Sequence, residues 1–119
     1  MTLDLREIGD VTIIDIDGRV TVEEGADIFR EGIQQVIGRG RVQLVLNFQG
    51  VSYIDSTAMG EIIRAYMSAT RRGGAMKLLK VPARIHEQLR TTRLLSVFDL
   101  FEAEAEALNS FGVVPTREH

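Results

Sequence analysis

Three polar side chains stand in a row near the middle of the sequence, at Asp55, Ser56 and Thr57. An apolar segment typical of a strand, 42–48, precedes them, and an amphipathic segment typical of a helix, about 58–72, follows them. Asp, Ser and Thr are all good helix N-caps, each worth about 1 kcal/mol over alanine, yet a helix needs only one. From the pattern alone two interpretations stay open: a plain cap, or a hydroxyl placed at a helix N-terminus as a phosphorylation switch.

A serine at a strand-to-helix turn could also be the nucleophile of a small hydrolase. Such a nucleophile elbow requires Gly-x-Ser-x-Gly, whereas Ile54 and Ala58 stand at the two glycine positions here. A catalytic triad would also need a histidine held by an acid, and the sequence gives His86 no such partner. We therefore keep a serine hydrolase only as a remote alternative and expect that the protein is not an enzyme.

The sequence predicts no cofactor and no metal. Neither Gly-x-x-x-x-Gly-Lys nor Gly-x-Gly-x-x-Gly occurs, so no phosphate-binding glycine loop is expected. Residues 15–18, Asp-Ile-Asp-Gly, resemble the start of a calcium loop, but Ala26 falls where the bidentate acid of such a loop is needed. The chain has no cysteine, and its two histidines, His86 and His119, lie far apart in the sequence, which makes a transition-metal site improbable.

Composition and charge exclude several classes of function. The 119 residues suffice for one domain with one core, and the formal net charge is -3. A negative chain is a poor candidate for direct binding of nucleic acid through phosphate contacts. No apolar run approaches the length of a membrane span, so we expect no membrane insertion. Together with the absence of cysteine, this pattern favours a cytoplasmic protein.

Hydropathy and turn residues predict an α/β domain. Strands are expected at 3–8, 11–17, 42–48 and 76–81, with an apolar run at 94–101 that resembles one more brief strand. Helices are expected between Thr21 and residue 37, over 58–72, after Pro82 and over 102–111. The short first turn makes the first two strands antiparallel, and the crossover helices make the remaining strands mainly parallel. The prediction is one mixed, mostly parallel sheet with about four helices over residues 1–112, and a flexible tail over 113–119.

Two helices carry more detailed predictions. Thr21, with Glu24 three residues later, has the pattern of a capping box and is expected to cap the first helix. The apolar residues of the first two helices recur at helical spacing and should face the core. These residues are Ile28, Phe29, Ile33, Val36 and Ile37 in the first helix, and Met59, Ile62, Ile63, Tyr66 and Met67 in the second.

The segment 51–60, Val-Ser-Tyr-Ile-Asp-Ser-Thr-Ala-Met-Gly, resembles the signature of the STAS domain, as found in bacterial anti-sigma factor antagonists. The core of that signature is Asp-Ser-[Ser/Thr]-Gly-Leu-Gly, entered from a strand. The order of elements, the strand that ends at Gly18 and the turn at residues 73–74 extend the resemblance to about residue 111. The resemblance implies a STAS-like single domain with helices mainly on one face of the sheet.

The resemblance also implies a function. In the family, the serine after the aspartate is phosphorylated by a partner that is both a serine kinase and an anti-sigma factor, and a serine phosphatase reverses the mark. On this chain that serine is Ser56, and the residues expected to contact the partner are Asp55, Ser56, Thr57, Met59 and Thr21. The unphosphorylated protein would sequester the anti-sigma factor, and a weak homodimer is compatible with the sequence.

The chain departs from the family pattern in two segments. Ala58 and Met59 replace the Gly-Leu of the signature, and both residues favour a helix. At residues 18–21 the chain has Gly-Arg-Val-Thr where antagonists commonly have Gly-Glu-[Ile/Leu]-Asp, so Thr21 replaces an aspartate that helps to bind the kinase. The alternative function is therefore a STAS subunit of another regulatory or transport assembly that is not switched by phosphorylation.

Overall fold

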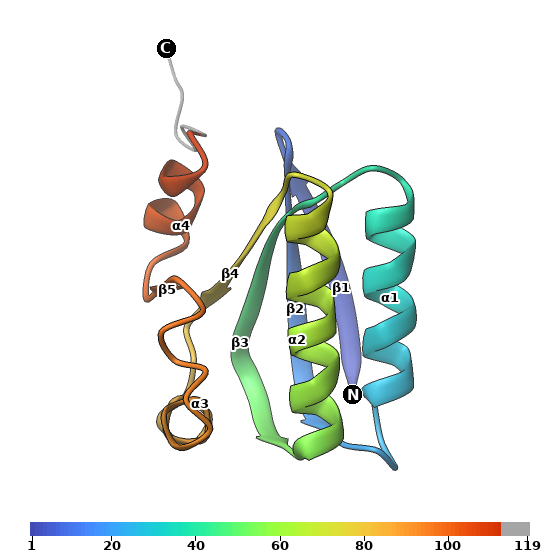
Figure 1. The fold of residues 1–119 in the computed structure, drawn as a ribbon, viewed down its shortest axis with the longest axis vertical. Helices are drawn as coiled ribbons and strands as arrows, with labels where there is room; N and C mark the ends of the chain where they lie inside the picture. The colour runs from blue at the N-terminus through green and yellow to red at the C-terminus, as the bar shows by residue number, and fades with distance from the viewer. Residues whose placement is uncertain (113–119) are drawn as a thin grey trace.

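A single five-stranded sheet forms the centre of the computed structural model, which describes residues 1–112 (Figure 1). Its strands follow the order of the sequence across the sheet. They are β1 (Thr2–Ile8), β2 (Val11–Val20), β3 (Gln43–Ile54), β4 (Ala75–Leu79) and β5 (Leu100–Phe101). β1 pairs antiparallel with β2, and each of the other pairs is parallel. The predicted mixed sheet with an antiparallel first strand is therefore confirmed.

Four helices cover the two faces of this sheet unequally. They are α1 (Ala26–Gly38), α2 (Ser56–Arg71), α3 (Ala83–Thr91) and α4 (Glu104–Ser110). The buried residues of α1, α2 and α3 share one core cluster with the inward side chains of β2, β3 and β4. α4 packs on the opposite face, where Ala107 and Leu108 join a smaller cluster. Within residues 1–112, no helix is long and apolar enough to cross a membrane.

The apolar stripes of α1 and α2 are narrower than predicted. Phe29, Ile33, Val36 and Ile37 are buried as expected, but Ile28 is 51% exposed. In α2 the core side is formed by Ala58, Ile62, Ala65 and Ala69 with Met59, whereas Met67 is 46% exposed. The cause is the angle of about 100° between successive helical residues, which places Ile28 and Met67 outside the arc that faces the sheet. Small residues on the side of α2 that faces α1 leave room for a groove, which is described below.

β2 and β3 run past the positions where the sequence predicts their ends. β2 continues beyond Asp17 to Val20, and β3 continues beyond Phe48 to Ile54. Gly18 has a φ of 101° and lies at a register shift rather than at a turn. Gly50 pairs with Asp17, the residue before Gly18, and a Cβ atom on Gly50 would collide with the carboxylate of Asp17. The glycines therefore form bulges, which bend the paired strands without separating them.

The last part of the described chain also differs from the prediction. Of the apolar run 94–101, only Leu100–Phe101 forms a strand, and Phe98 enters the core from a turn. Pro82 is the N-cap of α3, so the helix begins directly after it. The predicted tail, 113–119, lies outside the described residues.

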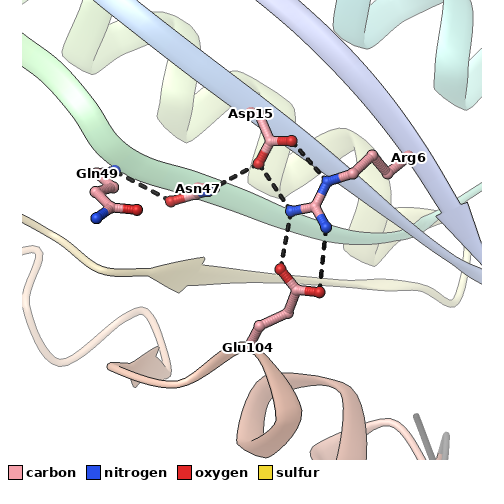
Figure 2. A network of polar contacts seen from close by, with 5 residues as sticks. All are labelled: Arg6, Asp15, Asn47, Gln49 and Glu104. Atoms are coloured by element: carbon pink, nitrogen blue, oxygen red, sulfur yellow. Dashed lines mark hydrogen bonds and ion pairs between the residues drawn. The ribbon is translucent and has the colours of Figure 1, made fainter. Parts of the chain in front are cut away.

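A polar network fixes α4 to the sheet (Figure 2). Arg6 of β1 donates to both carboxylate oxygens of Asp15 at 2.6 and 3.0 Å, and to both oxygens of Glu104 at 2.9 and 3.1 Å. Asn47 also donates to Asp15, at 2.8 Å. Hydrogen bonds from the Arg6 guanidinium hold the pKa of Asp15 below its ordinary value. Because Glu104 is the first residue of α4, these bonds set the position where the helix begins.

We predict that Glu104→Ala loosens α4 while the rest of the domain keeps its structure. The variant loses two charge-assisted hydrogen bonds at a partly exposed site, a loss of about 1 kcal/mol once screening by water is considered. Amide hydrogen exchange at Ala107 and Leu108 should therefore accelerate about fivefold, with α2 unchanged. The matched control is Glu106→Ala, which removes an exposed acid from the same first turn without touching Arg6. Equal acceleration in both variants would show that the network does not hold α4.

Candidate functional site

The candidate site lies where the parallel strands β2 and β3 reach their carboxyl ends. Val20, the last residue of β2, pairs with Ile54, the last residue of β3, and α2 begins two residues later. Ile54 is fully buried, and its carbonyl oxygen accepts a hydrogen bond of 3.0 Å from the side chain of Gln88 on α3. The corner that carries Asp55, Ser56 and Thr57 is therefore held by β2, β3 and α3 together.

Asp55 is the N-cap of α2, and it also holds a second segment. One carboxylate oxygen accepts from the Ala58 amide at 2.9 Å, which is the usual N-cap bond. The other oxygen accepts from the Val22 amide at 2.8 Å, in the loop between β2 and α1. The hydrogen bonds from Ala58 and Val22 lower the pKa of Asp55. Both bonds favour the ionised carboxylate, so Asp55 ties the loop to the start of the helix in its charged form.

The hydroxyls of Ser56 and Thr57 are not needed for the cap. Both residues are exposed at the first two positions of α2, and within residues 1–112 neither hydroxyl makes a hydrogen bond to the protein. The first turn of a helix presents unpaired amide groups and the positive end of the helix dipole. The structure thus answers why three capping residues stand together: one caps, and two hydroxyls remain available to a ligand or a modifying enzyme.

Thr21 has a different local role from the one the sequence predicts. The N-cap of α1 is Gly25, with a φ of 95°, so the predicted cap at Thr21 is wrong. Thr21 instead closes the turn before the helix: its hydroxyl accepts from the Glu24 amide at 3.0 Å. A Cβ atom at Gly25 would lie 2.9 Å from the carbonyl oxygen of Arg19, so this tight turn before α1 requires a glycine. Thr21 is only 8% exposed and shapes the loop from inside.

The other residues at the corner divide into buried and exposed ones. Met59, a predicted partner contact, is 8% exposed and belongs to the core cluster. Val22 was not singled out from the sequence, yet it is 62% exposed beside Asp55. Arg19 and Tyr53 form an adjacent pair, with the guanidinium carbon 4.8 Å from the ring centroid. An apolar type usually indicates a buried position, so the exposure of Val22 had no signal in the sequence.

The surroundings of Ser56 do not resemble a hydrolase site. His86 is exposed on α3, and in the described part of the chain Ser56 has no hydrogen bond to any histidine. A nucleophilic serine needs a base within hydrogen-bond distance, itself oriented by a third group. Residues 1–112 also contain no cluster of three or more His, Asp or Glu side chains that could hold a metal ion.

An exposed hydroxyl thus lies at a capped strand-to-helix corner, on a mixed sheet with three helices on one face. The family model of the STAS domain matches residues 2–107. The chain belongs to the STAS domain family.

Individual relatives agree with this assignment. An anti-sigma F factor antagonist from Paenibacillus polymyxa is 25% identical over 105 residues, which cover 87% of this chain and 89% of that protein. A Thermotoga maritima structure assigned as an anti-sigma factor antagonist has a TM-score of 0.86 at 21% identity, covering 91% of this chain and 92% of the other.

The Bacillus anti-sigma factor antagonist SpoIIAA has been solved in two states, and both resemble this chain. The unphosphorylated form has a TM-score of 0.74 at 18% identity, with 93% of this chain and 98% of the other covered. The phosphorylated form has a TM-score of 0.75 at 18% identity, with 92% and 99% covered. At this identity the likeness establishes the fold, which is the same for both states of that protein.

We predict that Asp55 stabilises the domain most strongly when it is ionised. Its folded-state pKa lies below the ordinary value of an aspartate, so the stabilisation is complete above that ordinary value and is lost as the pH falls through the folded-state pKa. At neutral pH the urea midpoint should fall in the order wild type, Asp55→Asn, Asp55→Ala, because asparagine keeps one acceptor oxygen and alanine keeps none.

The difference between wild type and Asp55→Asn should shrink as the pH falls below about 4, where both side chains become neutral. Asp10→Asn, in the β1–β2 turn, controls for the removal of a surface carboxylate. If the difference in urea midpoint between wild type and Asp55→Asn stays constant down to a pH of about 2.5, the charge of Asp55 has no role in stability.

Proposed function

We propose that this chain is an anti-sigma factor antagonist whose binding to an anti-sigma factor is switched by phosphorylation of Ser56. The observation that carries the proposal is the free, exposed hydroxyl of Ser56 beside a helix cap that Asp55 already supplies. The kinase would be the anti-sigma factor itself, a serine phosphatase would reverse the mark, and the exchange would take place in the cytoplasm. The named relatives, which are anti-sigma factor antagonists, support this choice among STAS functions.

Phosphorylation should change the surface without changing the fold. A phosphoserine carries about -1.5 to -2 charges at neutral pH. At the first position of α2 it meets the amides of the first helical turn and the positive end of the helix dipole, both of which stabilise an anion. The Ser56 hydroxyl that carries the phosphate makes no hydrogen bond within residues 1–112, so its modification breaks no native contact.

The same phosphate would strongly oppose docking of a protein partner. A partner that covers the corner must remove water from the added charge and from the nearby Asp55 carboxylate, which is already ionised. A penalty of about 3 kcal/mol lowers an affinity roughly a hundredfold. The modification can therefore release the partner although the domain stays folded.

The proposed partner-contact surface combines exposed residues with residues that hold them in place. Ser56 and Thr57 offer exposed hydroxyls, and Val22 adds an exposed apolar side chain on the loop that Asp55 holds in place. Asp55 and Thr21 act by shaping that loop. Met59 lies beneath the surface and supports the first turn of α2 from the core. Binding would therefore depend on Val22 as well as on the residues that the signature marks.

The test is phosphate transfer from ATP by the kinase-type anti-sigma factors of the same host. We expect one added phosphate, mapped to Ser56 by mass spectrometry, and an affinity for the kinase that falls about a hundredfold after modification. Ser56→Ala should take up no phosphate and bind as the unmodified protein does, whereas Thr57→Ala, with the neighbouring hydroxyl removed, should still be phosphorylated. Tight binding without phosphate transfer would overturn the switch and favour a STAS subunit that is not switched. The absence of both binding and phosphate transfer would overturn the whole proposal.

A further inference from the structure

A groove with a basic rim runs along the seam between α1 and α2, which stand side by side on the front of the sheet in Figure 1. It has a volume of about 330 Å³. Its floor is apolar: Ile33 and Ile37 of α1 and Ala65 of α2 are each 3–4% exposed. Ala65 and Ser68 are small, which leaves the space between the helices open. None of these residues belongs to the corner around Ser56.

Four arginines surround this floor, two of them near the C-terminal end of α2. They are Arg30, Arg64, Arg71 and Arg72. The single carboxylate in the lining is Glu61, which lies 3.6 Å from Arg30 and 3.5 Å from Arg64. The four guanidinium groups and the one carboxylate of the lining give it a formal charge of +3, and outside the lining Asp27 lies 3.5 Å from Arg30.

Arg30 is paired with Asp27 at 3.5 Å and Glu61 at 3.6 Å, but the three arginines at the α2 side of the groove are less engaged inside the domain. Among residues 1–112, Arg71 and Arg72 have no carboxylate within 4.0 Å, and Arg72 donates only to the carbonyl of Ile37 at 3.2 Å. The side chain of Arg64 is 70% exposed despite its contact with Glu61. Most of their donors therefore point to solvent, where guanidinium forks bind carboxylates well.

The sign of this charge is opposite to that of the chain. The protein carries a net charge of -3, so a groove at +3 is a local reversal of the field. A concave positive site on a negative molecule concentrates anionic partners at that site and repels them elsewhere. Charge complementarity therefore identifies an acidic occupant.

The length and the lining of the groove indicate a polypeptide rather than a small anion. From Glu61 to Arg72 the groove follows α2 for about 16 Å, or three helical turns. Arginines stand on both sides of a continuous apolar floor, so the matching ligand has a row of apolar side chains with carboxylates on both flanks. This is the pattern of an acidic amphipathic helix, which would lie along α1 and α2 as a third helix.

We propose that the α1–α2 groove docks an acidic amphipathic helix of a partner protein, at a surface separate from the Ser56 corner. The probe is a synthetic peptide of about 18 residues with leucines at helical spacing and glutamates on both flanks, long enough to form a helix on binding. Titrated into the full ¹⁵N-labelled chain, it should shift the amide signals of Gln34, Ile37 and Ser68, and the affinity should fall as salt is added.

Matched variants locate the contact. Arg64→Gln with Arg71→Gln should weaken the peptide at least about tenfold, since two charge-assisted contacts are removed. Arg84→Gln, an exposed arginine on α3, should have no effect. Ser68→Trp fills the groove without a change of charge and should abolish binding in a chain that circular dichroism shows to be folded. Ser56→Asp should bind the peptide normally, which separates this surface from the proposed switch.

Three results would overturn the proposal. The first is no shift with the acidic peptide at millimolar concentration, and the second is a shift confined to residues 20–25 and 55–60. The third is citrate that binds as tightly as the peptide, which would assign the groove to small organic anions. A peptide with lysines in place of the glutamates serves as the charge control and should not bind.

Discussion

The arrangement of the loop before α1 and the start of α2 depends on the two oxygens of one carboxylate. Asp55 caps α2 with one oxygen and holds Val22 with the other, and so joins two segments that are 33 residues apart in sequence. Because both oxygens accept from backbone amides, the bonds do not require any particular neighbouring side chain. The hydroxyls of Ser56 and Thr57 are therefore not needed to cap α2, and they stay available for contacts outside the domain.

A rigid helix connects this corner with the rest of the molecule. α2 places Ser56 at its first residue and the basic groove along its remaining turns, while Ala58, Ile62, Ala65 and Ala69 fix it to the core. Ala65 belongs both to the core cluster and to the floor of the groove, so the groove is built directly on the packed core.

The sequence predicts well those features that depend on neighbours along the chain. The residue types at 55–57, with the helical periodicity after them, predict the corner between β3 and α2. The short turn at residues 9–10 predicts that β1 and β2 pair antiparallel. The second bond of Asp55, the exposure of Val22 and the clamp from Arg6 to Glu104 could not be predicted. Each depends on a contact between distant segments, 98 residues apart in the case of Arg6 and Glu104. The glycines at 18 and 50 do not by themselves predict whether a strand ends or continues through a bulge, because both structures favour glycine.

The order of the strands has a consequence for biosynthesis. Each strand of the sheet pairs with the strand that precedes it in the sequence, from β1 to β5. A chain that emerges from the ribosome N-terminus first can therefore add every strand to an edge that already exists, with no wait for a later partner. Pairing between successive strands limits each closure to the one turn or crossover that joins the two strands. The domain can thus assemble progressively during translation, with α4 closing the second face at the end.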